Sequence, residues 1–289
     1  MSDTGSLVGA LVTPTRFVEV NGRKIAYRAV GEGKPIVLCT RFRGVLDLWD
    51  PAFVDSLAAE GFKVVTFDYS GLGQSTGERT YDPVSLAKDA KDLIDALGLK
   101  DVVIGGWSLG GIAAQIFLAM FGASVSHVVL IATTPPGKLV KTAEQLFYDT
   151  AGQSAASLEQ YTTLFFEPKD EGSRAASKRS FDRIFARKSD VSPAVPADWA
   201  VAQVGTAPKN PMFPSEEVLQ VLKTTTAPIL HLGGDHDIIL PIENWYALNG
   251  QLPTLHVITY PRAGHGPHHQ YPEAAATQIS AFINRTRMA

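Results

Sequence analysis

Hydrophobic and polar positions along the chain follow two periods, one typical of strands and one typical of helices. Two early segments, residues 16–20 and 24–30, alternate like strands, and Asn21-Gly22 between them favours a tight hairpin turn. Apolar β-rich runs then alternate with helical patterns at residues 36–38, 51–60, 63–67, 84–97, 102–104, 109–121 and 125–131. Such repetition implies right-handed crossovers, so we predict an α/β fold with a mostly parallel sheet that helices cover on both faces.

The pattern changes after Pro135-Pro136. Helical segments follow without a convincing strand, at residues 139–148, 158–166, 174–187 and 199–204. Alternation resumes at residues 228–232, 245–250 and 255–260 and ends with a helix at 272–285. We therefore predict one α/β core in two parts, residues 1–135 and 213–289, and a helical cap at 136–212. An insertion of roughly eighty residues is long enough to be a lid rather than a loop.

Composition limits the class of protein. The 289 residues carry a formal net charge of −3 without long runs of one sign, so we expect a small-molecule partner, no nucleic acid and no membrane. The stretch from Val102 to Gly137 has no Asp, Glu, Lys or Arg, but its glycines and polar residues favour buried core elements over a membrane span. Cys39 is the single cysteine, which excludes an intrachain disulfide, and we expect it to be a buried apolar thiol. The N-terminus lacks a signal-peptide pattern, so we expect a cytoplasmic protein, and whether it forms a homo-oligomer stays open.

A candidate nucleophile lies between a β-branched run and a helical pattern, in Gly106-Trp107-Ser108-Leu109-Gly110. This is the context that a G-x-S-x-G elbow requires. A sharp strand-to-helix turn strains the backbone at the serine, and the residues two positions away must be small to avoid collision. The turn would place the Ser108 hydroxyl at the carboxyl edge of the sheet and at a helix N-terminus, whose free amides favour developing negative charge.

With this segment the chain resembles the α/β-hydrolase fold family along nearly its whole length. The resemblance is to its serine-nucleophile branch of esterases, lactonases and cofactor-free haloperoxidases, and it implies eight strands with a cap inserted after the sixth. A second matching segment, residues 67–75, is similar to the turn D-x-R-G-x-G-x-S of the family, with Ser70 where arginine is common. In the family this turn is chiefly structural, so Asp68 and Ser75 receive no catalytic role.

A serine needs a base within hydrogen-bond reach, and that base needs an orienting carboxylate. His265 follows the last predicted strand between Gly264 and Gly266, and the resemblance indicates the same residue. His268 and His269 are rivals, although their polar neighbours suggest a solvated loop. For the acid, the resemblance favours Asp237, which precedes Pro241 by four residues, and Asp235 is the alternative.

Two preorganised amides must stabilise the oxyanion that forms during acyl transfer. One should be the amide of Leu109, and by position Phe42 should give the other. Many relatives have His-Gly in the loop after the third strand, where this chain has Thr40-Arg41.

Arg41 and Arg43 lie next to the expected oxyanion hole, and two interpretations of them stay open. They either recognise a substrate carboxylate by paired hydrogen bonds, or pair with acids such as Asp47 or Asp50 and fix the loop. Together with Trp107 of the elbow they are the candidate substrate-binding residues.

We therefore predict a carboxylic ester hydrolase that cleaves a small ester or lactone through an acyl-enzyme on Ser108, without cofactor or metal. Carbon–carbon bond hydrolysis and cofactor-free perhydrolysis are alternatives within the family. A ligand-binding receptor with little turnover is the alternative of another class, because the oxyanion loop departs from the family pattern. Aromatic residues of the predicted cap either line the pocket or pack between helices: Phe147, Tyr148, Tyr161, Phe165, Phe166 and Trp199.

Overall fold

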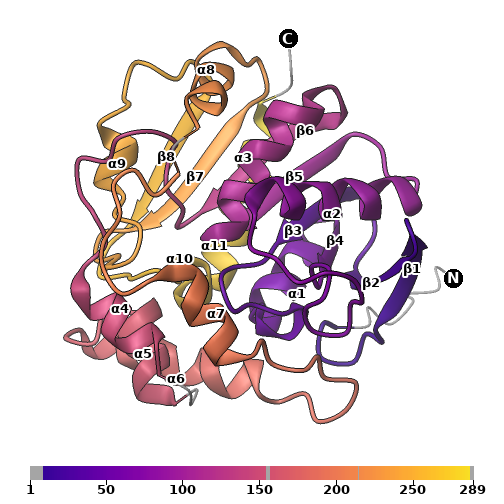
Figure 1. The fold of residues 1–289 in the computed structure, drawn as a ribbon, viewed down its shortest axis with the longest axis horizontal. Coiled ribbons are helices and arrows are strands. Elements are labelled where there is room, and N and C mark those ends of the chain that lie inside the picture. The colour runs from indigo at the N-terminus through magenta and orange to yellow at the C-terminus, as the bar shows by residue number, and fades with distance from the viewer. Residues whose placement is uncertain (1–8, 154–156, 214, 287–289) are drawn as a thin grey trace, which may run out of the picture.

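A single mixed sheet forms the centre of the molecule (Figure 1). The computed structural model describes residues 9–153, 157–213 and 215–286. Its eight strands lie in the order β1-β2-β4-β3-β5-β6-β7-β8. Their bounds are Arg16–Val20, Arg23–Val30, Lys34–Cys39, Phe62–Phe67, Val102–Trp107, Val125–Ile131, Ile229–Gly234 and Leu255–Tyr260. The prediction of an eight-stranded, mostly parallel sheet is confirmed.

Strand direction follows from the connections. The Asn21-Gly22 turn, with positive φ at both residues, joins β1 and β2 into an antiparallel hairpin. Strand β2 is also antiparallel to β4, whereas β3 to β8 are parallel to their neighbours. The parallel strands need crossovers, and helices supply them. The carboxyl ends of the parallel strands therefore meet at one edge of the sheet, where the side chains described below gather.

Helices cover both faces of the sheet and enclose two apolar cores. On one face α2 (Pro83–Ala96), α3 (Leu109–Phe121) and α8 (Glu216–Thr224) pack against the strands. On the other face α1 (Pro51–Ala59) and α11 (Pro272–Arg285) do the same. Strands β5 and β6 are buried at every position, which explains their continuous apolar sequence. Cys39 is part of the first core and is fully buried, as expected.

Five described helices lie between β6 and β7, and the four that precede α8 gather in the lower part of the view in Figure 1. They are α4 (Gln145–Ala151), α5 (Leu158–Phe165), α6 (Glu171–Ile184) and α7 (Ala197–Val204). Tyr161, Phe165 and Phe166 from this segment join the core on the α1 and α11 side. Short elements complete the fold: α9 (Glu243–Tyr246), α10 (Pro267–Gln270) and the 3-10 turns η1 (Leu46–Leu48) and η2 (Gly122–Ser124).

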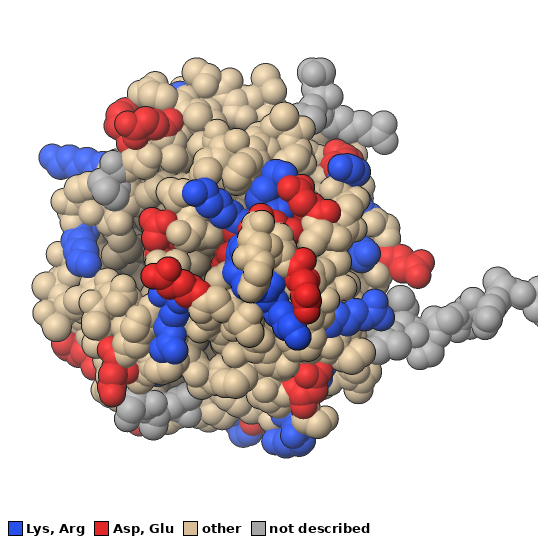
Figure 2. Space-filling view, turned by 45° about the vertical axis from the view of Figure 1, so that its right-hand side comes forward, with Lys and Arg blue, Asp and Glu red and all other residues tan. Residues whose placement is uncertain are grey.

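Charged side chains of both signs are interspersed on the face shown in Figure 2, with no large area of one sign. Among the helices that the structure describes, none has the length and apolarity needed to cross a bilayer.

Candidate active site

Ser108 lies at a strained turn between β5 and α3. Its backbone has φ 57° and ψ −119°, a conformation that costs an L-residue roughly 1–3 kcal/mol. The two flanking glycines are sterically required here. A Cβ on Gly106 would lie 2.0 Å from the carbonyl oxygen of Gly110, and one on Gly110 would lie 1.9 Å from that of Cys39. The local sequence thus produces the sharp elbow that its glycines indicated.

The Ser108 hydroxyl is available for chemistry. Ser108 occupies the N-cap position of α3, but its side chain caps no amide of that helix. Among the residues that the structure describes, its Oγ makes no hydrogen bond, although the residue is only 7% exposed. Its backbone is fixed instead, because Thr133 Oγ1 donates to its carbonyl oxygen over 2.7 Å. The hydroxyl therefore faces a pocket rather than a protein partner.

His265 and Asp237 form a buried pair beside this pocket. The distance between His265 Nδ1 and Asp237 Oδ2 is 2.8 Å, and both side chains are almost fully buried. Since an ionised carboxylate can only accept, Nδ1 carries the proton and Nε2 is the free ring nitrogen. Asp237 is itself held in place, because Oδ1 accepts from the amides of Ile239 and Leu240 at 2.8 and 2.9 Å. His265 lines the same pocket as Ser108.

The rival acid and bases lie elsewhere. Asp235 contacts His236 over 2.6 Å and accepts from the amide of Ala263, so it does not reach His265. His268 and His269 belong to α10 and are 0% and 1% exposed, which contradicts the expectation of a solvated loop. Their polar neighbours in sequence did not reveal that both rings pack against Trp107, at 4.6 and 4.7 Å between ring centroids.

Trp107 is a buried residue that contacts the loop of His265. Its indole Nε1 donates to the carbonyl oxygen of His265 over 2.7 Å, and the residue is 1% exposed. It is absent from the lining of the pocket, which differs from the expected contact with substrate. Sequence position within the elbow suggested a place at the surface of the pocket, but consecutive residues of a strand point to opposite faces of the sheet, and Trp107 packs in the core on the α1 and α11 side. Trp107 thus fixes the backbone of the histidine loop.

The loop after β3 presents the second candidate amide. Neither Phe42 N–H nor Leu109 N–H donates to another group within the described ranges. Arg43 adopts φ 54°, an uncommon angle for a residue with a side chain. Its amide donates to the Tyr81 hydroxyl over 2.9 Å, and the Phe42 and Tyr81 rings pack 5.2 Å apart. Tyr81, which no sequence motif indicated, thus holds the loop in this conformation.

Asp68 ties the turn after β4 to the same loop, in keeping with its predicted structural role. Its carboxylate accepts from the amides of Leu46 and Gln74 at 2.7 and 2.9 Å and from the Ser192 hydroxyl at 2.6 Å. Burial raises the pKa of this carboxyl to about 6. Ser75 donates to the backbone carbonyl of Asp68 over 2.7 Å.

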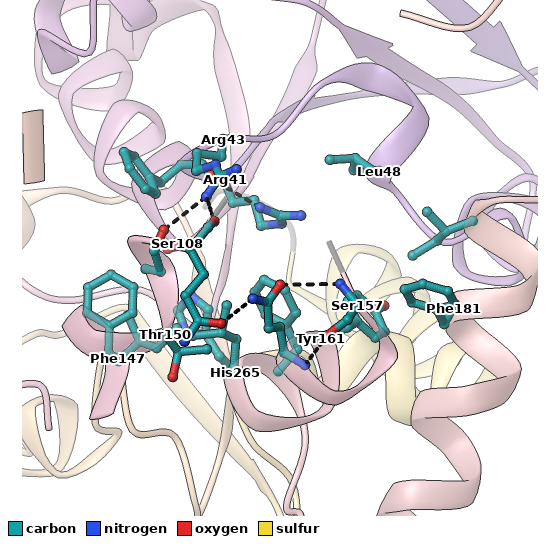
Figure 3. A pocket seen from close by; sticks show the side chains of 18 of the residues that line it. Arg41, Arg43, Leu48, Ser108, Phe147, Thr150, Ser157, Tyr161, Phe181 and His265 are labelled. Atoms are coloured by element: carbon teal, nitrogen blue, oxygen red, sulfur yellow. Dashed lines mark hydrogen bonds between the residues drawn. The ribbon is translucent and has the colours of Figure 1, made fainter. Parts of the chain in front are cut away.

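The two arginines of the loop do not pair with the nearby acids. Asp47 contacts Arg28 and Arg187, and Asp50 accepts two hydrogen bonds from Arg183 of α6. These partners lie far away in sequence, which is why proximity along the chain suggested the wrong pairing. Arg43 instead donates from Nη1 to the carbonyl oxygens of Ala151 and Gln153, at 2.9 and 3.1 Å (Figure 3).

The pocket has a volume of about 210 Å³ and lies between the sheet edge and helices α4 to α6. Ser108, His265 and the three residues 41–43 line it from the core side. Of the aromatic candidates in the predicted cap, Phe147, Tyr161 and Phe165 also line it, whereas Tyr148, Phe166 and Trp199 pack elsewhere. Pockets for drug-sized ligands usually measure roughly 300–1,000 Å³, so this one favours a small, largely apolar molecule.

In the part of the chain that the structure describes, no three His, Cys, Asp or Glu side chains are arranged to hold a metal ion. The chemistry that the residues themselves support is nucleophilic attack by an alcohol with a histidine base and an orienting carboxylate.

Comparison with known proteins places this geometry in a family context. The sequence model of the family described as alpha/beta hydrolase fold matches residues 34–272. The solved structure of an alpha/beta hydrolase fold protein from Chitinophaga pinensis superposes with a TM-score of 0.81, at 27% identity, over 96% of this chain and 100% of that one.

Two further proteins show how the names in this group vary. A relative from Mycobacterium tuberculosis, which carries the provisional name non-heme bromoperoxidase BpoC, is 26% identical over 90% of this chain and 97% of its own length. The structure of esterase RhEst1 from Rhodococcus sp. ECU1013 covers 94% of this chain and 99% of that one, with a TM-score of 0.69 and 22% identity. The latter likeness shows the fold.

Proposed function

Because this chain belongs to the α/β-hydrolase fold family, we propose that it is a serine hydrolase that cleaves a small carboxylic ester or lactone through an acyl-enzyme on Ser108. One observation carries the proposal. The buried hydrogen bond between His265 and Asp237 leaves the other ring nitrogen free in the pocket that Ser108 lines. This arrangement suits a histidine that takes a proton from an alcohol while a carboxylate steadies the resulting imidazolium.

The proposed reaction has two halves. Ser108 Oγ attacks the carbonyl carbon, its proton passes to His265 Nε2, and the carbonyl oxygen becomes an oxyanion. Collapse of this intermediate breaks the ester bond, and His265 returns the proton to the departing alkoxide. Water then attacks the acyl-enzyme with His265 as base, which releases the carboxylic acid and restores Ser108.

The proposed oxyanion hole consists of the amides of Phe42 and Leu109. Both donors are free of protein acceptors among the described residues, and Leu109 begins helix α3, whose N-terminus favours negative charge. Loss of one such donor typically costs about 100- to 1,000-fold in kcat, so the fixed conformation of residues 41–43 matters for rate.

We also propose that residues 136–212 act as a cap that selects the substrate. Described residues of this segment supply most of the pocket lining, including Phe147, Tyr161 and Phe165. An apolar cap over a small pocket excludes water and restricts the size of the acyl and alcohol groups.

A fluorophosphonate probe tests the nucleophile directly. We expect wild-type protein to be labelled, Ser108→Ala to be unlabelled, and His265→Gln to be labelled far more slowly. Ser124→Ala is the matched control, because that hydroxyl donates to the Phe121 carbonyl at the end of α3, away from the pocket. Failure of the intact protein to react, together with inactivity on p-nitrophenyl esters and lactones, would favour the receptor class instead.

A second candidate activity, cofactor-free perhydrolysis, is favoured by the name of the Mycobacterium tuberculosis relative. In that reaction hydrogen peroxide replaces water in the attack on the acyl-enzyme. The ratio of peracid to acid formed from one ester at increasing peroxide concentration separates the two activities. A hydrolase should form mainly acid at every concentration tested.

A further inference from the structure

Arg41 is a half-buried cation in the candidate active-site pocket. It follows β3 directly, and its side chain reaches from the loop into the pocket that Ser108 and His265 also line (Figure 3). Two aromatic rings enclose the guanidinium. Its carbon lies 5.1 Å from the centroid of the Trp107 ring and 4.7 Å from that of Phe165.

This guanidinium has no anionic partner within the described residues. It forms no ion pair, and its one hydrogen bond runs from Nη1 to the carbonyl oxygen of Phe42, 2.8 Å away. Its Nε is shielded from water and makes no hydrogen bond. Burial lowers the pKa of Arg41 to about 10, and the charge of Arg43 adds to the lowering.

Removing a charge from water is costly unless an opposite charge or full hydrogen bonding compensates. Contacts with the faces of Trp107 and Phe165 attract the cation, but they compensate only part of that cost and satisfy none of its N–H donors. Arg43 shows the contrast, because its guanidinium is already engaged with the carbonyl oxygens of Ala151 and Gln153. Arg41 is thus the cation of this loop that keeps a buried N–H donor, Nε, without an acceptor among the described residues.

We propose that Arg41 binds a carboxylate of the substrate, so that the preferred substrates are small esters or lactones that carry a second, ionised carboxyl group. The proposal rests on the proposed function, because the same pocket contains Ser108. A planar guanidinium with free donors matches a carboxylate by paired hydrogen bonds. A single uncompensated cation suits a monoanion better than a phosphate dianion.

Binding to an inactive protein tests the subsite without relying on catalysis. Ser108→Ala would be titrated calorimetrically with the monomethyl esters of succinate, glutarate and adipate and with the neutral amides of the same length. We expect at least one acid to bind roughly 10- to 100-fold more tightly than its amide, as a charge-assisted pair predicts. High salt should reduce this difference.

Two substitutions at Arg41 then test whether this residue causes the preference for the acid over the amide. In Ser108→Ala protein, Arg41→Gln and Arg41→Met should each remove the preference for the acid, and the control Arg179→Gln, at an exposed position of α6 outside the pocket lining, should retain it. Equal thermal midpoints of the variants would show that the fold is intact. Equal binding of acid and amide, or a preference that survives both Arg41 substitutions, would overturn the proposal.

Kinetics on the otherwise wild-type enzyme complete the test. The substrates are mono-p-nitrophenyl adipate and the p-nitrophenyl ester of its neutral half-amide. Arg41→Gln should raise KM for the anionic ester roughly 10- to 100-fold and change kcat little, with a much smaller effect on the neutral ester. Equal loss on both esters contradicts carboxylate recognition. Absence of fluorophosphonate labelling would overturn the hydrolase proposal, whereas the calorimetric titration would still test carboxylate binding by Arg41.

Discussion

Asp237 accepts a hydrogen bond from His265 Nδ1 over 2.8 Å with one carboxylate oxygen, while its other oxygen accepts two backbone amides. The carboxylate is therefore fixed by its own loop before it orients the histidine. Asp235, two residues earlier, contacts the partly exposed His236 instead.

This difference gives a matched pair of variants. Asp237→Asn should keep the fold but favour the wrong histidine tautomer, and kcat should fall by about 10,000-fold. Asp235→Asn should keep a kcat close to that of the wild type. Steady-state kinetics on one p-nitrophenyl ester measures both, and a large loss in Asp235→Asn alone would move the acid to that residue.

The elbow makes a prediction about stability. Gly110→Ala would place a Cβ 1.9 Å from the backbone oxygen of Cys39, so we expect destabilisation above about 4 kcal/mol or no folded protein. Gly122→Ala at the other end of α3 is the control. The nearest atom there is 3.8 Å away and φ is −53°, so alanine should stabilise by roughly 0.4–1 kcal/mol. Urea unfolding measures both, and equal effects would contradict the steric argument.

Arg183 of α6 holds the fully buried Asp50 through two hydrogen bonds of 2.8 and 2.6 Å. Arg183→Met would leave this carboxylate without its cation, at a cost of about 3–5 kcal/mol for a buried pair. We expect the lower part of this range, because the Arg183 side chain is 31% exposed and water can partly replace it.

The exposed Arg179 on the same helix is the control, and Arg179→Met should change stability by less than about 0.5 kcal/mol. Adding Asp50→Asn to Arg183→Met should recover part of the loss, because the uncompensated charge is then gone. Chemical denaturation measures the free energy of unfolding of the single and double variants. A double variant whose loss equals the sum of the two single losses would contradict this prediction.

Buried histidines predict sensitivity to acid. Burial lowers the pKa of His231 and of His269 to about 3, and burial together with His269 lowers that of His268 well below its usual value. An unfolded histidine takes up a proton near pH 6.5. Between about pH 6.5 and 3 the unfolded chain therefore binds more protons, so stability falls as pH falls, by roughly 1.4 kcal/mol per pH unit for each histidine.

Asp68 acts in the opposite sense. Burial raises its pKa to about 6, so between about pH 4 and 6 the folded state binds the proton more readily, which offsets about one histidine. His268 packs on Trp107 and Phe53 and neither of its ring nitrogens has a partner in the described structure. His268→Phe should stabilise the protein and lower the pH slope by about 1.4 kcal/mol per unit. Urea midpoints from pH 7 to 5 test this, with the exposed His256→Gln expected to match wild type.

Local signals predicted the sheet and the elbow at Ser108, whereas Asp237 and His265 were indicated largely by the resemblance to a known family. Period, turn residues and flanking glycines act over a few positions, and the elbow at Gly106 and Gly110 follows directly from steric contacts. The roles of these three residues in catalysis and the cap boundaries stay predictions.

What the sequence could not predict depends on contacts between distant segments. The acids near Arg41 in sequence are bound by Arg28, Arg187 and Arg183, which leaves Arg41 unpaired. The indole of Trp107 turns away from the pocket to bond the histidine loop. Tertiary packing determines these ion-pair partners and this side-chain orientation, and no local sequence motif predicts them.

Cys39 is buried at the end of β3, just before the loop that contains Arg41. Its burial determines how this protein can be labelled for spectroscopy. The thiol is fully buried, and burial raises its pKa to about 12, so little thiolate is present at neutral pH. Maleimide dyes should leave the native chain unmodified. A single exposed cysteine, introduced for instance by Leu146→Cys on α4, would then carry a fluorophore without background and report movement of that helix as ligands enter.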